Sequence, residues 1–228
     1  MEIKDIKKEA AKYKGKSKTG HEEFDRDGSL FVPNLLVVDG MVRIPEARKQ
    51  NRRYIKDGTY VIIPQEITKS DGFETYGYPE YKSKYFEVKR KLEKILGKRL
   101  HQTYYFDRFY FNGDDLKYHQ DRPACQISVS INIEQPKDCE WPFYITTPDN
   151  RTMSHITKPG DGVIYKGCEC PHWRERLNCT EKEHYHQIFM HYVLQDGHLV
   201  EHAFDAIDSM NFNPIPFQLD SNNDVSIL

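Results

Sequence analysis

Polar and apolar residues alternate without interruption over residues 126–133, Gln-Ile-Ser-Val-Ser-Ile-Asn-Ile. Successive side chains of a β-strand point to opposite faces, so this segment predicts a strand with one apolar face against a core and one polar face lining a cavity. Runs of aromatic and β-branched residues predict three further strands, at residues 103–111, 163–165 and 185–193. The pattern is that of a mainly β protein.

One helix interrupts this pattern, over residues 80–96. Apolar residues recur there at helical spacing, at Tyr85, Val88, Leu92 and Ile95. Pro79 marks its start and Gly97 its end, because proline is favoured in the first turn of a helix and glycine just after the last.

The chain of 228 residues suits one domain with elaborations. Residues 1–28 are rich in Lys, Glu and Gly and carry few large apolar groups, which predicts a flexible N-terminal arm. Residues 29–208 are the predicted domain, with short strands over residues 30–63 and a core at roughly residues 100–200. Residues 209–228 are predicted to be a loop-like C-terminal tail.

The formal net charge of −2 gives no reason to expect a nucleic-acid or acidic-membrane partner. No apolar run is long enough to span a bilayer, and the first residues, Met-Glu-Ile-Lys-Asp, do not resemble a signal peptide. Five cysteines, an odd number, argue against a secreted disulfide framework. We therefore expect a cytoplasmic protein.

The most informative residues for chemistry are the triplet His119-Gln120-Asp121 and a later histidine, His172. At a period of two residues, His119 and Asp121 of a strand point to the same side, so one imidazole and one carboxylate converge. A second imidazole from His172 completes two histidines and one carboxylate on one face of a metal. This facial triad leaves coordination positions open and is the ligand set of non-heme iron(II) oxygenases.

The triad stands in an ordered series of motifs. Tyr110-Phe-Asn-Gly113 precedes His119-Gln-Asp121, and Pro159-Gly-Asp161 precedes His172 and the aromatic strand at residues 185–193. This order resembles the iron(II)/2-oxoglutarate-dependent dioxygenases, nearest the prolyl-4-hydroxylase-like branch. The resemblance implies a double-stranded β-helix (jelly roll, cupin-like) with flanking helices and with the triad at the mouth of the barrel.

The resemblance also implies cofactors and a reaction. Iron(II) is expected on His119, Asp121 and His172, with 2-oxoglutarate and O2 on the remaining positions. The implied reaction oxidises 2-oxoglutarate to succinate and carbon dioxide while a C–H bond of a small molecule or peptidyl residue is hydroxylated, as in prolyl hydroxylases. No catalytic residue beyond the metal ligands is implied, and the substrate and the oligomeric state stay open.

Enzymes of this branch bind the distal carboxylate of 2-oxoglutarate with a strand tyrosine and a basic residue. Tyr110 lies at the family's distance before the histidine and matches that tyrosine, although a core tyrosine is the alternative. An Arg or Lys normally follows on the strand after the distal histidine. This chain has neither between Glu183 and Val200, and His186 falls at that position.

Two arginines are candidates for the missing charge. Arg174 is preferred, because on a strand it shares a face with His172 and its guanidinium can bind a carboxylate through two hydrogen bonds. Arg108 is second, two residues before Tyr110 and on the same strand face. A salt-bridged surface arginine is the alternative for both. Arg122, next to the triad aspartate, is expected to pair with that carboxylate or to face water.

Two other classes of protein remain open. In a zinc-binding module, Cys168, Cys170 and His172 would share one strand face with Cys179 nearby, although their spacing is unlike that of most zinc sites. The other alternative is a non-catalytic, cupin-like protein that only binds a ligand. The metal content separates these interpretations.

Overall fold

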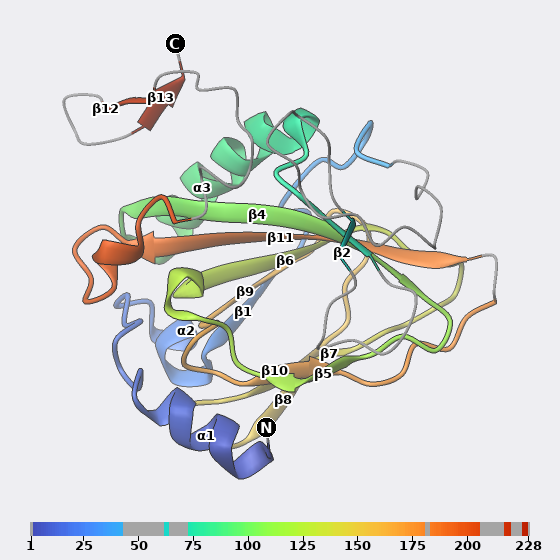
Figure 1. Ribbon diagram of the computed structural model, residues 1–228, viewed down its shortest axis with the longest axis horizontal. Helices are drawn as coiled ribbons and strands as arrows, with labels where there is room; N and C mark the ends of the chain where they lie inside the picture. Colours follow the sequence, from blue (N-terminus) through green and yellow to red (C-terminus); the bar gives the residue numbers. More distant parts are fainter. Residues whose placement is uncertain are drawn as a thin grey trace.

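The computed structural model describes residues 2–42, 62–63, 73–180, 183–205, 217–219 and 225–227. Two antiparallel sheets face each other in it, a 7-stranded sheet and a 4-stranded sheet, with helices on the outside (Figure 1). Within these residues, no helix is both long enough and apolar enough to cross a membrane.

The larger sheet has the strand order β1 (Ser29–Val32), β9 (Gly162–Tyr165), β6 (Ile127–Glu134), β11 (His184–Leu194), β4 (Leu100–Phe111), β3 (Phe73–Tyr76) and β2 (Ile62–Ile63). The smaller sheet has the order β5 (Leu116–His119), β10 (His172–Arg174), β7 (Phe143–Thr146) and β8 (Thr152–His155). A separate hairpin pairs β12 (Phe217–Leu219) with β13 (Val225–Ile227). The helices are α1 (Ile3–Ala11), α2 (Glu22–Asp27) and α3 (Lys82–Leu96), with short 3-10 turns η1 (Pro79–Tyr81), η2 (Pro123–Cys125) and η3 (Val200–His202).

Along the chain from β4 to β11, the strands alternate between the two sheets, except that the β7–β8 hairpin stays in the smaller one. Each crossing carries the chain from one sheet to the other, so the two sheets become the walls of one flattened barrel. This is the predicted double-stranded β-helix, or jelly roll. The four strands predicted from alternation and aromatic content are present as β4, β6, β9 and β11.

The alternation in β6 produces two different faces. Its apolar side chains pack into the main core cluster, which α3 also joins: Ile127, Val129, Ile131 and Ile133. Its polar side chains face β11 inside the barrel. There the Ser130 hydroxyl donates to Gln187 Oε1 at 2.7 Å, and Asn132 Nδ2 donates to the Tyr185 hydroxyl at 3.0 Å. The barrel interior is therefore polar at this level, as the sequence predicts.

The predicted helix is α3, which covers the outer face of the larger sheet (Figure 1). Its apolar buried residues keep helical spacing: Tyr85, Val88, Leu92 and Leu96. It begins at Lys82 because the residues before it form the 3-10 turn η1. It ends at Gly97, whose φ of 64° lies in the left-handed region that glycine adopts most readily. The Tyr85 hydroxyl donates to the His191 carbonyl at 2.6 Å and ties α3 to β11.

Residues 2–28 contain α1 and α2, which pack against the rest of the domain, whereas their composition predicts a flexible arm. Phe24 of α2 is fully buried in the main core cluster. Ile6 and Ala10 of α1 are buried as well, one helical turn apart. The segment has few apolar residues, but they are spaced to face the protein, and composition does not record spacing.

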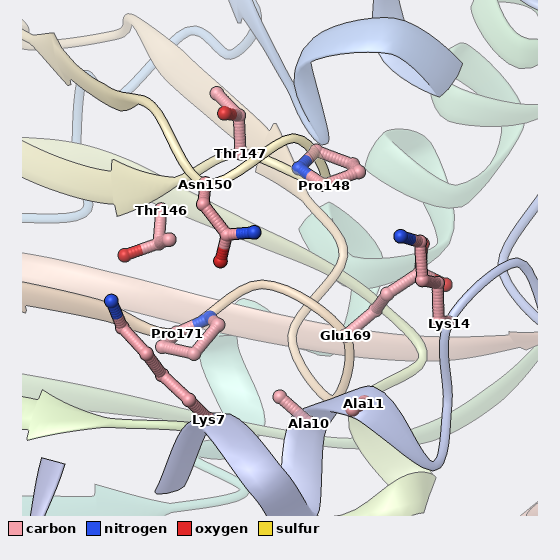
Figure 2. A pocket seen from close by; sticks show the side chains of 10 residues that line it. All are labelled: Lys7, Ala10, Ala11, Lys14, Thr146, Thr147, Pro148, Asn150, Glu169 and Pro171. Carbon is pink, nitrogen blue, oxygen red and sulfur yellow. The ribbon is translucent and has the colours of Figure 1, made fainter. Parts of the chain in front are cut away.

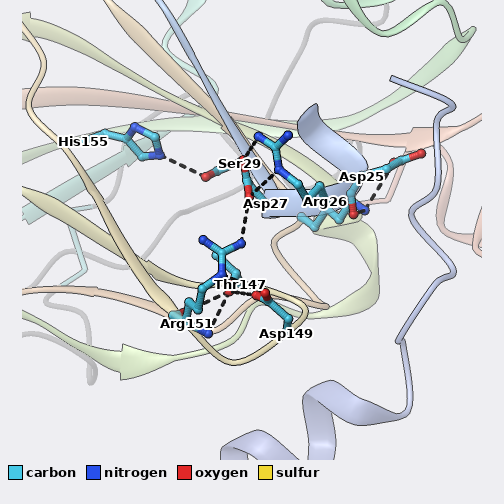
Figure 3. Close-up of polar contacts among 9 residues, drawn as sticks. Asp25, Arg26, Asp27, Ser29, Thr147, Asp149, Arg151 and His155 are labelled. Carbon is cyan, nitrogen blue, oxygen red and sulfur yellow. Dashed lines mark hydrogen bonds and ion pairs between the residues drawn. The ribbon is translucent and has the colours of Figure 1, made fainter. Parts of the chain in front are cut away.

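Polar contacts fasten α2 to both sheets. Arg151, in the turn before β8, lies 3.0 Å from the Asp27 carboxylate (Figure 3). Lys166, which follows β9, is buried and lies 3.3 Å from the Asp25 carboxylate. Its ammonium is 5.3 Å from the centre of the Phe24 ring. These contacts explain how a charged segment stays docked.

A hollow of about 120 Å³ lies between α1 and the turn that joins β7 to β8 (Figure 2). Lys7 and Asn150 are among the residues that line it. The triad residues His119, Asp121 and His172 are not among them, so this hollow is separate from the predicted metal site.

Parts of the predicted organisation lie outside the described residues. Of the strands predicted over residues 30–63, the structure describes β1 and β2, and residues 43–61 fall outside it. Of the predicted tail, residues 209–228, only β12 and β13 are described.

Replacing Phe24 tests whether the N-terminal segment belongs to the folded domain. Because its ring is fully buried, Phe24→Ala is expected to lower the free energy of unfolding by about 3–5 kcal/mol. Ile3→Ala is the control, because Ile3 is 57% exposed and its loss should change that free energy by less than about 0.5 kcal/mol. Urea unfolding followed by circular dichroism measures both. Equally small effects would show that the segment is not docked.

Candidate metal centre

Two short strands of the smaller sheet bring the two predicted histidine ligands together. His119 is the last residue of β5 and His172 is the first of β10, and the antiparallel register makes them direct partners. Their ring centres lie 4.4 Å apart. Strand pairing therefore joins the two halves of the motif.

Asp121 reaches the histidines by a different route from the one that the sequence predicts. β5 ends at His119, so Asp121 lies in the following loop and not on the strand. Its amide donates to the Gly167 carbonyl at 2.9 Å, and this bond anchors the loop beside the end of β9. Asp121 Oδ1 lies 3.5 Å from His119 Nε2 and 3.6 Å from His172 Nε2. The three side chains converge because the chain bends, and not because a strand alternates.

Backbone carbonyls hold both imidazoles in the form that binds a metal through Nε2. His119 Nδ1 lies 2.7 Å from the carbonyl oxygen of Lys117, and His172 Nδ1 lies 3.0 Å from that of Cys170. A carbonyl only accepts hydrogen bonds, so each Nδ1 carries the proton and each Nε2 keeps its lone pair. Metal-binding histidines are usually oriented by outer hydrogen bonds of this kind.

The protonation states of two triad residues suit a cation. Burial lowers the pKa of His172 to about 4, which keeps this ring neutral at neutral pH. Burial alone would raise the pKa of the Asp121 carboxyl, but the imidazoles of His172 and His119 outweigh it and hold the pKa below its ordinary value. A neutral imidazole and an ionised carboxylate bind a metal without first losing a proton.

Gly167 allows the Asp121 carboxylate to lie where it does. A Cβ at this position would lie 2.5 Å from Asp121 Oδ2, 2.8 Å from Ser128 Oγ and 2.4 Å from the Cys125 carbonyl oxygen. Any side chain there would have to displace the carboxylate or the backbone. Gly167 therefore belongs to the site although it offers no ligand atom, and the sequence analysis did not identify it.

The triad lies on the wall of a cavity of about 90 Å³, the metal cavity. Most other lining residues are aromatic or aliphatic: Tyr104, Phe106, Tyr110, Leu116, Tyr165 and Phe189. Tyr110, which the resemblance assigns to 2-oxoglutarate, is thus on the cavity wall. Its ring packs against Trp141, with 4.8 Å between the ring centres.

Arg174 is buried inside the barrel and is not a salt-bridged surface residue. Only 2% of it is exposed, and its guanidinium carbon lies 4.6 Å from the Trp141 ring centre. The guanidinium donates to the Trp141 carbonyl and, at 3.2 Å, to Gln187 Oε1. Among the described residues, no carboxylate pairs with it, and burial lowers its pKa. Tyr110 and Tyr165 of the cavity wall lie close enough to act on that pKa in the opposite direction.

Two buried donors at this point have no hydrogen-bond partner among the described residues, Arg174 Nε and Gln187 Nε2. Gln187 Oε1 is already occupied, because it accepts from Ser130 and from Arg174. A cation that is buried without a carboxylate partner, and single N–H donors that are buried without an acceptor, cost free energy. The donor set therefore fits an anion that would bind beside the metal cavity.

His186 does not take the place of the family's basic residue. Its Nε2 lies 2.6 Å from Asp107 Oδ2, and its ring stacks on Phe109 with centres 3.9 Å apart. On a strand, its neighbours Tyr185 and Gln187 face the opposite way, into the barrel. Counting along the sequence therefore identifies a residue one position too early. A difference of one residue puts a side chain on the opposite face of a strand. The inward position is held by the neutral Gln187, which the sequence analysis missed.

Arg108 is fully buried on β4 and stands directly opposite Gln187 in the register. Its guanidinium carbon lies 4.8 Å from the centre of the Tyr110 ring. Arg108 and Tyr110 therefore share one face of β4, as their spacing predicts.

The sequence analysis also missed His191 of β11. This residue is 2% exposed and lines the metal cavity, with Nδ1 at 2.8 Å from Ser128 Oγ. Burial lowers its pKa to about 4. Potential ligand atoms of Asp121, Cys125 and His191 lie within 4.8 Å of one another, so His191 borders the triad. The alternation of β11 could have identified His191, because it puts every second residue on the inward face.

The cysteines of the zinc interpretation do not assemble into a site. Cys168 and Cys170 are buried in different apolar clusters. In the part of the chain that the structure describes, no group of three potential metal ligands contains Cys168, Cys170 or Cys179. The two buried cysteines act as small apolar residues.

No protein-family model matches this sequence, and no curated protein matches it. Solved structures do match the fold. An oxidoreductase of the 2OG-Fe(II) oxygenase family from Burkholderia pseudomallei matches with a TM-score of 0.54, over 82% of this chain and 90% of its own, at 11% identity. A Pseudomonas putida prolyl-4-hydroxylase matches with 0.50, over 75% and 95%, at 13% identity. The alpha-ketoglutarate-dependent epimerase SnoN of nogalamycin biosynthesis matches with 0.52, over 84% and 83%, at 13% identity.

These likenesses establish the double-stranded β-helix fold of the chain. At such low identity, the chemistry has to be argued from the residues of this chain.

Adding a methyl group at Gly167 tests its role beside the metal ligands. Gly167→Ala is expected to weaken ferrous iron binding by about tenfold or more, because changes beside metal ligands typically cost that much. Gly162→Ala is the control, because the three atoms nearest to its Cβ would belong to the side chains of Leu35 and Ile131. It should lower stability and leave iron affinity unchanged. Anaerobic titration measures the affinity, and equal losses in both variants would contradict a specific role for Gly167.

Proposed function

We propose that this protein is an iron(II)- and 2-oxoglutarate-dependent dioxygenase that hydroxylates a C–H bond of a small molecule or peptidyl residue. The observation that carries the proposal is the convergence of His119, Asp121 and His172 at a buried cavity, with both imidazoles oriented through Nδ1. Two histidines and one carboxylate on one face are the ligand set of non-heme iron oxygenases. The fold shared with a 2OG-Fe(II) oxygenase structure supports it.

The residues of the chain have distinct tasks in this proposal. His119, Asp121 and His172 would hold iron(II), with 2-oxoglutarate and O2 as the reactants beside it. When bound, these groups supply the oxidation of a substrate C–H bond, with release of succinate and carbon dioxide. The carbonyls of Lys117 and Cys170 keep the imidazoles in place. The aromatic cavity wall keeps bulk water away from the bound reactants.

Arg174 and Gln187 are the proposed receptor for the distal carboxylate of 2-oxoglutarate. Both are buried beside the metal cavity, and each has a donor that no described residue satisfies. A carboxylate between them would accept those hydrogen bonds and pair with the guanidinium, and charge-assisted hydrogen bonds of this kind are roughly twice as strong as neutral ones. Tyr110 and Arg108, on the facing strand, are the further candidates for the same group.

A non-catalytic, cupin-like ligand-binding protein is the alternative function. It would use the same fold and the same cavity, and only its behaviour toward iron and 2-oxoglutarate would differ. The ordered tautomers of His119 and His172 favour a metal-binding site over a simple ligand pocket.

The proposed substrate is an amino acid or a peptidyl proline. This choice rests on analogy with the prolyl-4-hydroxylase whose fold the chain shares. Nucleic acid is a poorer candidate, because a formal net charge of −2 supplies no excess of cations for phosphates.

Anaerobic titration with ferrous iron tests the metal site. The wild-type protein is expected to bind one ion, and His119→Ala and Asp121→Ala are expected to lose that binding, because each removes one of three ligands. His184→Ala is the matched control, because this histidine pairs with Glu134 at 3.0 Å and does not line the cavity. Unchanged binding in both triad variants would remove the basis of the proposal.

Steady-state kinetics of succinate formation test the carboxylate receptor. Arg174→Ala is expected to raise the 2-oxoglutarate KM about tenfold or more, because a hydrogen bond to a charged group is worth roughly 1.5–3 kcal/mol. Gln187→Glu should also raise it, because the new carboxylate would compete for the same guanidinium. Thermal unfolding shows whether each variant is folded. A normal KM in folded protein of both variants would move the role to Arg108.

A further inference from the structure

Arg122 places a positive charge at the edge of the metal cavity. It directly follows the ligand Asp121 and precedes η2. Its guanidinium carbon lies 4.6 Å from the centre of the Tyr104 ring, and Tyr104 is part of the cavity wall. The Arg122 side chain is 47% exposed, so a ligand arriving from solvent can reach it.

The partner of Arg122 is not the one that the sequence predicts. Its Nη1 donates to the carboxylate of Asp205, a residue 83 positions later in the chain. Asp121 is directed instead toward His119 and His172. The guanidinium at the cavity edge therefore already holds a carboxylate, which shows the kind of group that its geometry accepts.

The residue before Asp205 has an unusual backbone conformation. Phe204 has a φ of 60°, in the left-handed region, which a bulky side chain rarely adopts. Its amide donates to the Gln102 carbonyl at 2.7 Å, and its ring lies 5.3 Å from that of His101. Conformations of this kind persist only where the surroundings impose them. The backbone beside Asp205 is therefore held at a cost. The ion pair itself joins side chains that are 47% and 33% exposed, and ion pairs with this exposure are weak, so a competing carboxylate could displace Asp205.

We propose that Arg122 binds a carboxylate of the substrate and that Asp205 occupies Arg122 as a displaceable stand-in. This inference rests on the proposed oxygenase function and narrows its substrate to molecules with a free carboxylate beside the oxidised C–H bond, such as a free amino acid.

Few other residues at the metal cavity could bind a substrate carboxylate. Among the described residues that line it, there is no lysine and no arginine. Arg174 is fully buried and is already assigned to the cosubstrate. A guanidinium binds a carboxylate through two parallel hydrogen bonds, and one half-exposed arginine whose present partner is a single aspartate matches one negative charge. A phosphate would call for several cations, whereas the described residues on the cavity wall include none.

The test compares matched acids and amides. Succinate formation by the iron-loaded wild-type protein is measured with no second substrate, with each free amino acid, and with the corresponding primary amides. At least one free amino acid is expected to stimulate turnover, and its amide is expected to stimulate it at least tenfold less. If wild-type protein turns over 2-oxoglutarate but no free amino acid stimulates it, or if amides work as well, the inference is wrong and the oxygenase function stands. No turnover under any condition would instead overturn the oxygenase function.

Variants of Arg122 and of Asp205 are expected to change the KM for the stimulating acid in opposite directions. Arg122→Gln is expected to raise the KM for the stimulating acid on the order of tenfold to a hundredfold, and Arg122→Lys less, because an ammonium keeps the charge but not the paired geometry. Asp205→Asn is expected to lower that KM, because the internal competitor is gone. An Asp205→Asn protein with an unchanged or raised KM would show that the ion pair only tethers the chain.

The matched controls are Arg151→Gln and Asp149→Asn. Both break an ion pair of 2.7 Å that also joins a half-exposed arginine to an aspartate, but in the turn between β7 and β8 (Figure 3). Arg151→Gln also removes the contact of Arg151 with Asp27, whereas Asp149→Asn leaves that contact in place. Neither residue lines the metal cavity, and neither variant should change the KM for the acid. The same KM change in Arg151→Gln as in Arg122→Gln would contradict a specific role for Arg122.

Discussion

β10 is a strand of three residues held between β5 and β7, and its register decides what faces the barrel interior. The pairing puts His172 opposite His119. Two residues later, the same face carries Arg174 inward, whereas Trp173 between them faces outward and stacks on Tyr144 with centres 5.2 Å apart. One short strand therefore positions a proposed metal ligand and a buried cation on the same face. A shift by one residue would turn both away from the cavity.

Charge inside the barrel is the second constraint. Asp121 is an anion whose neighbours are two imidazoles, and Arg174 is a cation without a described carboxylate. In an apolar interior, an unpaired charge is costly, so each half of the site calls for a partner of opposite sign. A divalent metal would neutralise Asp121, and the carboxylate of an organic acid would neutralise Arg174. The fold thus provides two complementary charges at the positions where the proposed cofactor and cosubstrate would bind.

The fold alone does not identify the reaction that a protein carries out. The structures that share this fold include a prolyl-4-hydroxylase and an epimerase, which carry out different reactions. One fold therefore hosts different reactions, and the activity of each protein depends on its own site residues. In this chain the edge of the metal cavity holds Arg122 and Asp205, and the N-terminal helices pack outside the barrel. Specificity is therefore best sought at the residues beside the cavity rather than in the strands of the sheets.

The local pattern of the sequence was sufficient for several features. Alternation in residues 127–133 determined strand β6, and helical spacing between Pro79 and Gly97 determined α3, because both depend only on neighbours along the chain. The order of His119, Asp121 and His172 was sufficient to propose a set of metal ligands, and the structure brings these three side chains together. The composition of residues 1–28 misled, because the burial of Phe24 depends on a partner surface that composition does not contain.

Only the tertiary structure decided which face each residue takes. His186 and Gln187 are neighbours, and the pairing of β11 with its two sheet partners sends one outward to Asp107 and the other inward to Arg174. Gly167 matters because it lies against a carboxylate 46 residues earlier (167 − 121 = 46), and Arg122 is held by an aspartate 83 residues away. Contacts between residues so far apart in the chain depend on strand register and on packing. Local sequence patterns do not show them, because those patterns depend only on neighbouring residues.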